Sequence, residues 1–301
     1  MPDPTSIFIR RTIRQIVDFI LFSNLFVALC AVCQALVTYK LLNVKPQQEV
    51  LALLFCSTLA LYNFSMLLSK PVQPKKSPFR RVRWIFSHYR LMVTLTIISI
   101  ISLLPLTFFL SVPSLVLLFF LAVISISYNL PLFSMNDKKF GLRNIPGLKL
   151  FLIALIWSGS CVLLPIVETS ARNIITISAA DTILLVAKRF LFIAALTIPF
   201  DIRDLFQDRN YNLKTIPVVA GEKKAYLFCE ILLLAYITLL FLFTQELSAN
   251  FCALTLTILL SGWLIFKSSM KKNEYYYFLY LDGILILQYV IIVLFNWIWS
   301  L

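Results

Sequence analysis

The sequence predicts an all-α fold, a polytopic membrane bundle of about nine transmembrane helices. Three observations lead to this prediction. Apolar residues fill 60% of the 301 positions, charged residues fill only 14%, and the mean hydropathy is +0.89. Average soluble domains carry about 25% charged residues, so a soluble enzyme, a disordered chain and a secreted disulfide scaffold are excluded. Glycine is scarce, at 6 residues, and no stretch alternates like a barrel strand, so we expect helical spans.

Nine apolar segments follow one another along the chain, each near the length of about 20 residues that a transmembrane helix needs. Two of them are less regular. The segment 113–130 is short, and Lys188 and Arg189 interrupt 181–201, from which their long side chains would reach the outer interface if the helix is tilted. We expect one transmembrane domain over residues 1–301. Its spans are 16–39, 49–68, 91–111, 113–130, 147–167, 181–201, 224–244, 249–267 and 276–299.

The basic residues are distributed unevenly between the predicted loops. With the N-terminus in the cytoplasm, 22 of the 27 Lys and Arg residues fall on the cytoplasmic side. Cytoplasmic loops collect such residues, so we predict this orientation, with the C-terminus outside and the loops 69–90, 131–146 and 201–223 in the cytoplasm. The net charge of +13 would then meet anionic membrane lipid, which leaves no reason to expect nucleic acid. We expect the protein in the inner membrane of a bacterium.

Three aspartates at the cytoplasmic end of the sixth span are the sharpest local feature. The spacings between Asp201, Asp204 and Asp208 put them on one helical face if the span continues into the loop. Stacked like charges repel, and a Mg²⁺ ion would offset this, since it takes carboxylate oxygens and bridges them to phosphates. The alternative is a solvated acidic turn balanced by Arg203 and Arg209. The spacing alone leaves both open.

Two motifs resemble those of a known family. The stretch 201–221 contains DIRDLFQD and then TIPVVAG, and this DxRDxxxD followed by TxPVxxG resembles the second aspartate-rich motif of the UbiA superfamily of intramembrane prenyltransferases. The stretch 127–132, SYNLPL, followed by Lys138 and Lys139, is similar to the family's Tyr-x-x-Pro-Leu segment and its basic residues. Nine helices with cytoplasmic motif loops are also the family's architecture, so the resemblance covers about residues 16–299.

The chain departs from the family at its first motif, NxxxDxxxD, which is expected to close the second span. Asn63 fits the asparagine position. Leu67 and Pro71 occupy the two aspartate positions, and no Asp or Glu occurs from Val50 to Asn136. The carboxylates of the first motif are therefore lost, and the remaining motif would hold a single Mg²⁺ ion.

The resemblance implies a reaction and a set of site residues. A prenyltransferase of this family passes the isoprenoid chain of an isoprenoid diphosphate to a lipophilic acceptor, while Mg²⁺ neutralises the leaving diphosphate. Asp201, Asp204 and Asp208 would then be catalytic residues and metal ligands. The implied substrate-binding residues are Asn63, Tyr128, Lys138, Lys139, Arg143 and Arg203.

Aromatic and acidic residues near the motifs are further candidates. Tyr62, Tyr128 and Phe200 could stabilise a carbocation through their ring faces, although most aromatic residues of such a chain face lipid or pack. Asp282, inside the last span, is either a functional ionisable group that faces the bundle interior or part of an interhelical hydrogen bond.

The lost first motif leaves three hypotheses. In the first, the protein is an enzyme in which the seven basic residues between Lys70 and Arg90 take the diphosphate charge directly. In the second, it is a non-catalytic UbiA-fold protein that binds lipid or an isoprenoid diphosphate. In the third, it is a membrane carrier or assembly partner whose basic loops anchor it to anionic lipid. We favour the enzyme, because a scaffold without chemistry would be expected to lose the second motif as well.

Cysteine labelling tests the predicted orientation. Single cysteines introduced at Ser77 and Asn212 should react with a membrane-impermeant maleimide only after the cells are permeabilised. Cysteines at Lys45, Arg172 and Leu301 should react in intact cells, because the 22 to 5 division of basic residues puts these positions outside. Protection of Arg172 or Leu301 in intact cells would contradict the orientation.

Overall fold

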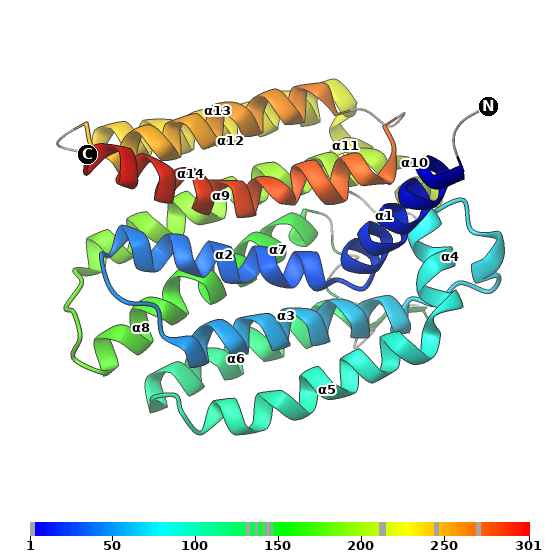
Figure 1. The fold of residues 1–301 in the computed structure, drawn as a ribbon, viewed down its shortest axis with the longest axis horizontal. Helices are drawn as coiled ribbons and strands as arrows, with labels where there is room; N and C mark the ends of the chain where they lie inside the picture. The colour runs from blue at the N-terminus through cyan, green and yellow to red at the C-terminus, as the bar shows by residue number, and fades with distance from the viewer. Residues whose placement is uncertain are drawn as a thin grey trace.

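The structure is a computed structural model that describes residues 4–130, 133–135, 138–140, 142, 145, 147–210, 215–243, 247–268 and 272–301. Long helices lie side by side along a common direction, and α1 (Pro4–Phe22) and the end of α14 (Gly283–Trp299) lie at opposite ends of the bundle (Figure 1). The helical prediction is therefore confirmed.

The remaining helices are α2 (Leu25–Leu41), α3 (Gln48–Leu68), η1 (Pro74–Lys76), α4 (Arg80–Ser87), α5 (Tyr89–Thr107), α6 (Val112–Asn129), α7 (Leu148–Ser158), η3 (Gly159–Leu163), α8 (Leu164–Ala171), α9 (Ala179–Arg203), α10 (Leu205–Asn210), α11 (Ile216–Ala220), α12 (Glu222–Leu242), α13 (Ala249–Lys267) and η4 (Tyr276–Leu281). The π-helical segment η3 joins α7 to α8, and the π-helical η4 leads into α14. A short antiparallel ribbon, β1 (Phe133–Met135) with β2 (Lys138–Phe140), lies in a loop for which the sequence predicts no strand.

The lengths and compositions of the helices support the prediction of a multi-pass membrane protein but do not confirm the number of nine spans. Within the part of the chain that the structure describes, seven helices are long and apolar enough to cross a membrane. An eighth span results if α1 and α2, bent by 62° at their junction, cross together. The predicted segment 113–130 corresponds to a shorter apolar helix, Val112–Tyr128. Large apolar side chains stay exposed on α5 and α6, among them Ile101, Leu104 and Phe119, as expected where lipid covers the surface.

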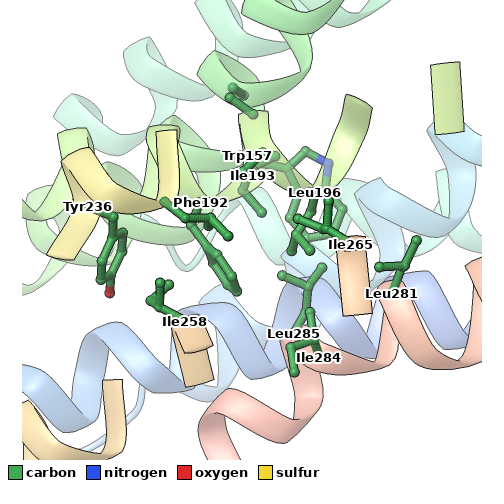
Figure 2. Packing of buried hydrophobic residues seen from close by; sticks show 14 of the residues in the cluster. Trp157, Phe192, Ile193, Leu196, Tyr236, Ile258, Ile265, Leu281, Ile284 and Leu285 are labelled. Atoms are coloured by element: carbon green, nitrogen blue, oxygen red, sulfur yellow. The ribbon is translucent and has the colours of Figure 1, made fainter. Parts of the chain in front are cut away.

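The main core lies where α2, α7, α9, α12, α13 and α14 meet. Figure 2 shows part of this cluster, with Trp157 beside Ile193 and Leu196 and with Leu285 in the same packed group. The helix α9 packs closely against α7 and α12, and α2 packs against α3 and α14. Four of these elements, α2, α7, α9 and η4–α14, surround the site described below.

The predicted span 16–39 is broken at its centre. Asn24, between α1 and α2, has a φ of 66°, a left-handed conformation that asparagine adopts more readily than most residues. Its side chain is held from outside the helix, because the Asn24 Nδ2 donates to the Asn63 Oδ1 at 2.6 Å. The break therefore turns a polar side chain of the first span towards the motif asparagine on α3.

The sixth predicted span ends earlier than the aspartate spacing requires. The helix α9 ends at Arg203, and Asp204 takes the cap position with φ −90° and ψ 6° before α10 begins. Aspartate favours helix ends because its carboxylate competes for local hydrogen bonds. The continuous helical face from Asp201 to Asp208 that the spacing predicts is thus interrupted.

The two basic residues within the sixth span do not both reach the outer interface. Lys188 is half-buried, but only 6% of Arg189 is exposed, and its side chain points into the bundle. The guanidinium contacts Gln288 of α14, which fixes its direction away from lipid.

Candidate functional site

A cavity of about 180 Å³ lies among α2, α7, α9 and η4–α14. Its charged lining residues lie near the start of α7, at the end of α9, at the junction of η4 and α14, and on α4. Apart from Thr197, the lining residues one to three turns further along α7 and α9, and Leu285 on α14, are apolar. The charged members are Arg81, Lys149, Asp201, Arg203 and Asp282. The cavity therefore has a charged mouth and an apolar interior.

Arg81 reaches the cavity from α4, whose N-terminus is fixed by a distant carboxylate. Glu274 accepts hydrogen bonds from the backbone N–H groups of Arg80 at 2.7 Å and of Arg81 at 3.0 Å. These N–H groups have no partner within their own helix, and a negative charge is favourable there. The Arg81 guanidinium then donates to the Asn24 Oδ1 and lies 4.5 Å from the centroid of the Phe278 ring.

Arg203 is held at the mouth by one carboxylate and three rings. Its Nε and one terminal nitrogen donate to the two oxygens of Asp204, at 2.8 and 3.0 Å. The guanidinium carbon lies 5.3 Å from the ring centroid of Phe200 and 5.1 Å from those of Tyr277 and Phe278. Aromatic faces stabilise cations, and Phe278 contacts the guanidinium groups of both arginines.

The two guanidinium groups repel each other in a place with little water. Burial and, to a smaller extent, the charge of Arg203 lower the pKa of Arg81 to about 10, while Asp282 acts in the opposite direction. Arg81 still carries its charge at neutral pH. An anion bound between the two groups would relieve this repulsion, so the mouth is suited to an anion.

Asp201 is held by a lysine that follows the 131–146 loop. The Lys149 Nζ lies 2.6 Å from an Asp201 carboxylate oxygen, and only 2% of the Asp201 side chain is exposed. Asp204 and Asp208 lie close enough for their charges to act on Asp201, and the charge of Asp208 also acts on Lys149. The ammonium group of Lys149 therefore supplies a positive charge that the aspartate cluster needs.

The predicted magnesium ligands do not assemble into a metal site. In the described ranges, no group of three Asp, Glu, His or Cys side chains comes together as a metal ion would require. Asp201 is paired with Lys149, and Asp204 with Arg203. Mg²⁺ demands near-octahedral oxygen ligands. The residues present fit ammonium and guanidinium groups, and they do not fit a Mg²⁺ ion held by Asp201, Asp204 and Asp208 together.

A second cavity, of about 260 Å³, lies beside the first, among α3, α6 and α7. Tyr128, predicted as a substrate contact, lines it together with Ser65 and Ser125. Arg81 and Tyr62 line both cavities. The two cavities are therefore neighbours that share a wall.

The other predicted site residues have different locations. Asn63 is fully buried and joined through Asn24 to Arg81. Lys138 and Lys139 belong to β2, but their side chains lie outside the described residues, and so does the whole of Arg143.

The basic segment 70–90 contributes less to the cavity than its charge predicts. Arg81 lines the cavity, whereas Arg80 pairs with Asp18 and the exposed Arg83 donates to the backbone carbonyl oxygen of Ser77. The sequence analysis missed the particular role of Arg81 and did not single out Lys149. Lys149 lies two residues after the NIPG stretch 144–147, which follows the SYNLPL segment and its basic residues, and this position was the available signal.

The fold and the cavity define a helical membrane protein with an internal cavity whose mouth is lined by charged residues. Neither protein-family models nor curated proteins give a match, but solved structures do. A UbiA homolog from Aeropyrum pernix K1 in its apo form has 15% identity and a TM-score of 0.60, covering 93% of this chain and 98% of its own. A UbiA homolog from Archaeoglobus fulgidus bound to GPP and Mg²⁺ has 12% identity and a TM-score of 0.66, covering 92% and 99%. The same homolog bound to DMAPP and Mg²⁺ has 13% identity and a TM-score of 0.64, covering 94% and 99%.

The chain thus has the fold of the UbiA homologs over nearly its whole length. This confirms the fold that the two motifs predict.

A double-mutant cycle tests the pair between Lys149 and Asp201. Lys149→Met should destabilise the protein by about 3 kcal/mol, because it leaves a buried carboxylate without its counter-ion. The double variant Lys149→Met with Asp201→Asn should recover much of this loss. Thermal unfolding of the purified protein in detergent measures both, and Lys75→Met, at an exposed position, is the matched control. A cost of Lys149→Met no greater than that of the control would contradict the pairing.

Proposed function

We propose that this protein binds an isoprenoid diphosphate, with the diphosphate at the charged mouth and the hydrocarbon chain in the apolar interior, and transfers the chain to a lipophilic acceptor. The observation that carries the proposal is the convergence of Arg81, Lys149 and Arg203 on the mouth of an apolar cavity. The fold supports it, since similar structures hold GPP and DMAPP.

The charge balance of the mouth favours an anionic group. Three cations and two carboxylates, Asp201 and Asp282, line the cavity. The formal balance is positive before a ligand arrives. Guanidinium groups bind phosphate oxygens in bidentate fashion, and the guanidinium groups of Arg81 and Arg203 are both held in place at the mouth. The mouth therefore suits a diphosphate.

The residues present account for the transfer without a metal held by the protein. When the bond between the allylic carbon and the diphosphate oxygen breaks, its electron pair leaves with the diphosphate, and Arg81, Arg203 and Lys149 stabilise the growing negative charge. The ring faces of Tyr62 and Phe200 line the same cavity and stabilise the positive allylic carbon. The apolar walls exclude water, which would otherwise capture that carbon.

The acceptor must lose a proton when its new bond to the allylic carbon forms. Asp282 lines the cavity and has no described basic group within the 4.0 Å of an ion pair, whereas Asp201 and Asp204 do. We assign Asp282 as the proton acceptor. The neighbouring cavity is the place for the acceptor, because Tyr62 and Arg81 line both spaces and Ser65, Ser125 and Tyr128 offer hydroxyl groups. An acceptor with its own hydroxyl or carbonyl group fits this lining.

A second candidate function is binding without transfer. It is favoured by the loss of both first-motif carboxylates at Leu67 and Pro71, together with the ion pairs that occupy Asp201 and Asp204. The two functions share the diphosphate site and differ in whether a product forms. A carrier or assembly role, the third hypothesis, would require neither diphosphate binding nor product. The orientation in the membrane, the single domain and the bacterial inner membrane stay predictions.

Calorimetric binding of geranyl diphosphate in detergent tests the cationic site. Binding should persist in EDTA, because side-chain cations supply the charge, and it should weaken as salt rises. Arg81→Gln and Arg203→Gln should each weaken it by at least about tenfold, as expected for the loss of a charge-assisted hydrogen bond. Arg83→Gln, an exposed change on the same helix α4, is the matched control and should leave binding unchanged.

Loss of binding in EDTA, with Arg81→Gln equal to the control, would contradict the cationic site. Failure of the wild-type protein to bind geranyl diphosphate with or without Mg²⁺ would contradict the proposed function and favour the carrier or assembly role. Binding without product from a panel of lipophilic phenols and alcohols would favour the non-catalytic function.

A further inference from the structure

The functional site leaves one costly feature of the bundle unexplained, the guanidinium of Arg189. It lies on α9 within a membrane-spanning helix, and only 6% of the residue is exposed. No carboxylate of the described residues lies within the 4.0 Å of an ion pair. An unneutralised charge inside a membrane bundle is unfavourable and marks a functional position more often than a packing one.

A buried glutamine contacts this charge at a long distance, and a second buried glutamine is hydrogen-bonded to the first. The Arg189 Nη1 contacts the Gln288 Oε1 at 3.5 Å, which is long for a hydrogen bond. The Gln288 Oε1 also accepts from the Gln34 Nε2 at 3.1 Å, and the same nitrogen donates to the Leu285 backbone oxygen at 2.8 Å. The Gln34 Oε1 has no hydrogen-bond partner among the described residues. We call Arg189, Gln288 and Gln34 the polar layer.

The polar layer lies directly beyond the deep end of the first cavity. The deepest lining residues are Val27, Trp157, Ile193 and Leu285, one on each of the four surrounding elements. Along α2, α9 and α14, the members of the polar layer lie beyond these residues, on the side away from the charged mouth. Arg189 is one turn beyond Ile193, Gln288 is one turn beyond Leu285, and Gln34 is two turns beyond Val27.

The depth of the cavity follows from the helix α9. Ten residues separate Arg203 at the mouth from Ile193 at the deep end, which is about 15 Å at 1.5 Å per residue. Its volume of about 180 Å³ is below the roughly 300–1,000 Å³ of pockets for drug-sized ligands. The enclosed space therefore suits a short hydrocarbon chain.

We propose that the polar layer sets the chain-length specificity of the cavity, so that a short isoprenoid chain is accepted and a long one is rejected. The inference rests on the proposed function. A chain that extends past Ile193 and Leu285 would have to place hydrocarbon against the Arg189 guanidinium. The hydrocarbon would separate the guanidinium from its remaining polar contacts and would offer it no hydrogen-bond acceptor. A short chain ends above the layer and leaves it intact. Arg189 is thus a specificity-determining residue that does not touch the diphosphate.

Competition between chain lengths tests the inference. Dissociation constants of geranyl diphosphate and geranylgeranyl diphosphate are measured by calorimetry on the whole protein in detergent. The wild-type protein should bind the shorter compound more tightly. Arg189→Met, which keeps the length of the side chain and removes the charge, should tighten binding of the longer compound by at least about tenfold and leave the shorter one unchanged.

The controls separate specificity from a structural role. Lys188→Met removes the adjacent, half-buried charge on the same helix and should leave both constants unchanged. If Arg189→Met does not fold, the double variant with Gln288→Leu replaces the layer with apolar side chains, a replacement that is often neutral or stabilising, and it should show the same gain for the longer compound. A purely structural role would change the stability and leave the ratio of the two constants as it is.

Equal affinity of the wild-type protein for both compounds would overturn the inference and leave the proposed function standing. The same holds if the folded variants keep the wild-type ratio. If neither compound binds the wild-type protein, the proposed function fails and this inference fails with it.

Discussion

The repulsion between Arg81 and Arg203 is the constraint on which the rest of the site depends. Both guanidinium groups contact Phe278, and the lowered pKa of Arg81 shows how strongly burial and the second charge act on it. Keeping them together requires several contacts. Glu274 fixes the start of α4, Asn24 accepts from Arg81, and Asp204 binds Arg203. These contacts come from four separate parts of the chain, so the bundle must be assembled before the charges can meet.

Composition and motif spacing predict the fold well, because the hydrophobic demand of a membrane leaves few alternatives to a helical bundle. The same information predicts Asn63 and the loop after α9 as parts of the site. It does not single out Arg81 among seven basic residues, since the selection is made by Glu274 and Asn24, about 190 and 60 positions away. It also overestimates the length of α9. The spacing of three and four between the aspartates predicts a helix that continues to Asp208, whereas α9 ends at Arg203.

The aspartate pattern illustrates how a motif can keep its residues while their partners change. In a chain with two carboxylate motifs, a divalent cation would be the natural counter-ion of both. Here no carboxylate stands at Leu67 or Pro71, and Asn24 links Asn63 to Arg81 by hydrogen bonds. The carboxylates of the second motif then face cations that belong to the protein, Lys149 and Arg203. Asp201 and Asp204 hold these cations in position.

Positive charge lies at both ends of the cavity, and burial decides what each charge does. At the mouth, Arg81 and Arg203 are held by carboxylate, amide and aromatic groups, so a diphosphate can approach them and replace some of these contacts at little net cost. Beyond the deep end, the Arg189 guanidinium contacts the Gln288 amide at 3.5 Å, no carboxylate among the described residues lies within ion-pair distance of it, and the neighbouring cavity wall is apolar. An anion that reached Arg189 would have to leave water entirely, and a hydrocarbon chain beside the guanidinium would offer it no hydrogen-bond acceptor. Under the proposed function, the same kind of side chain would therefore attract one end of an amphipathic ligand and exclude the other, because the cost of desolvation rises along about 15 Å of helix.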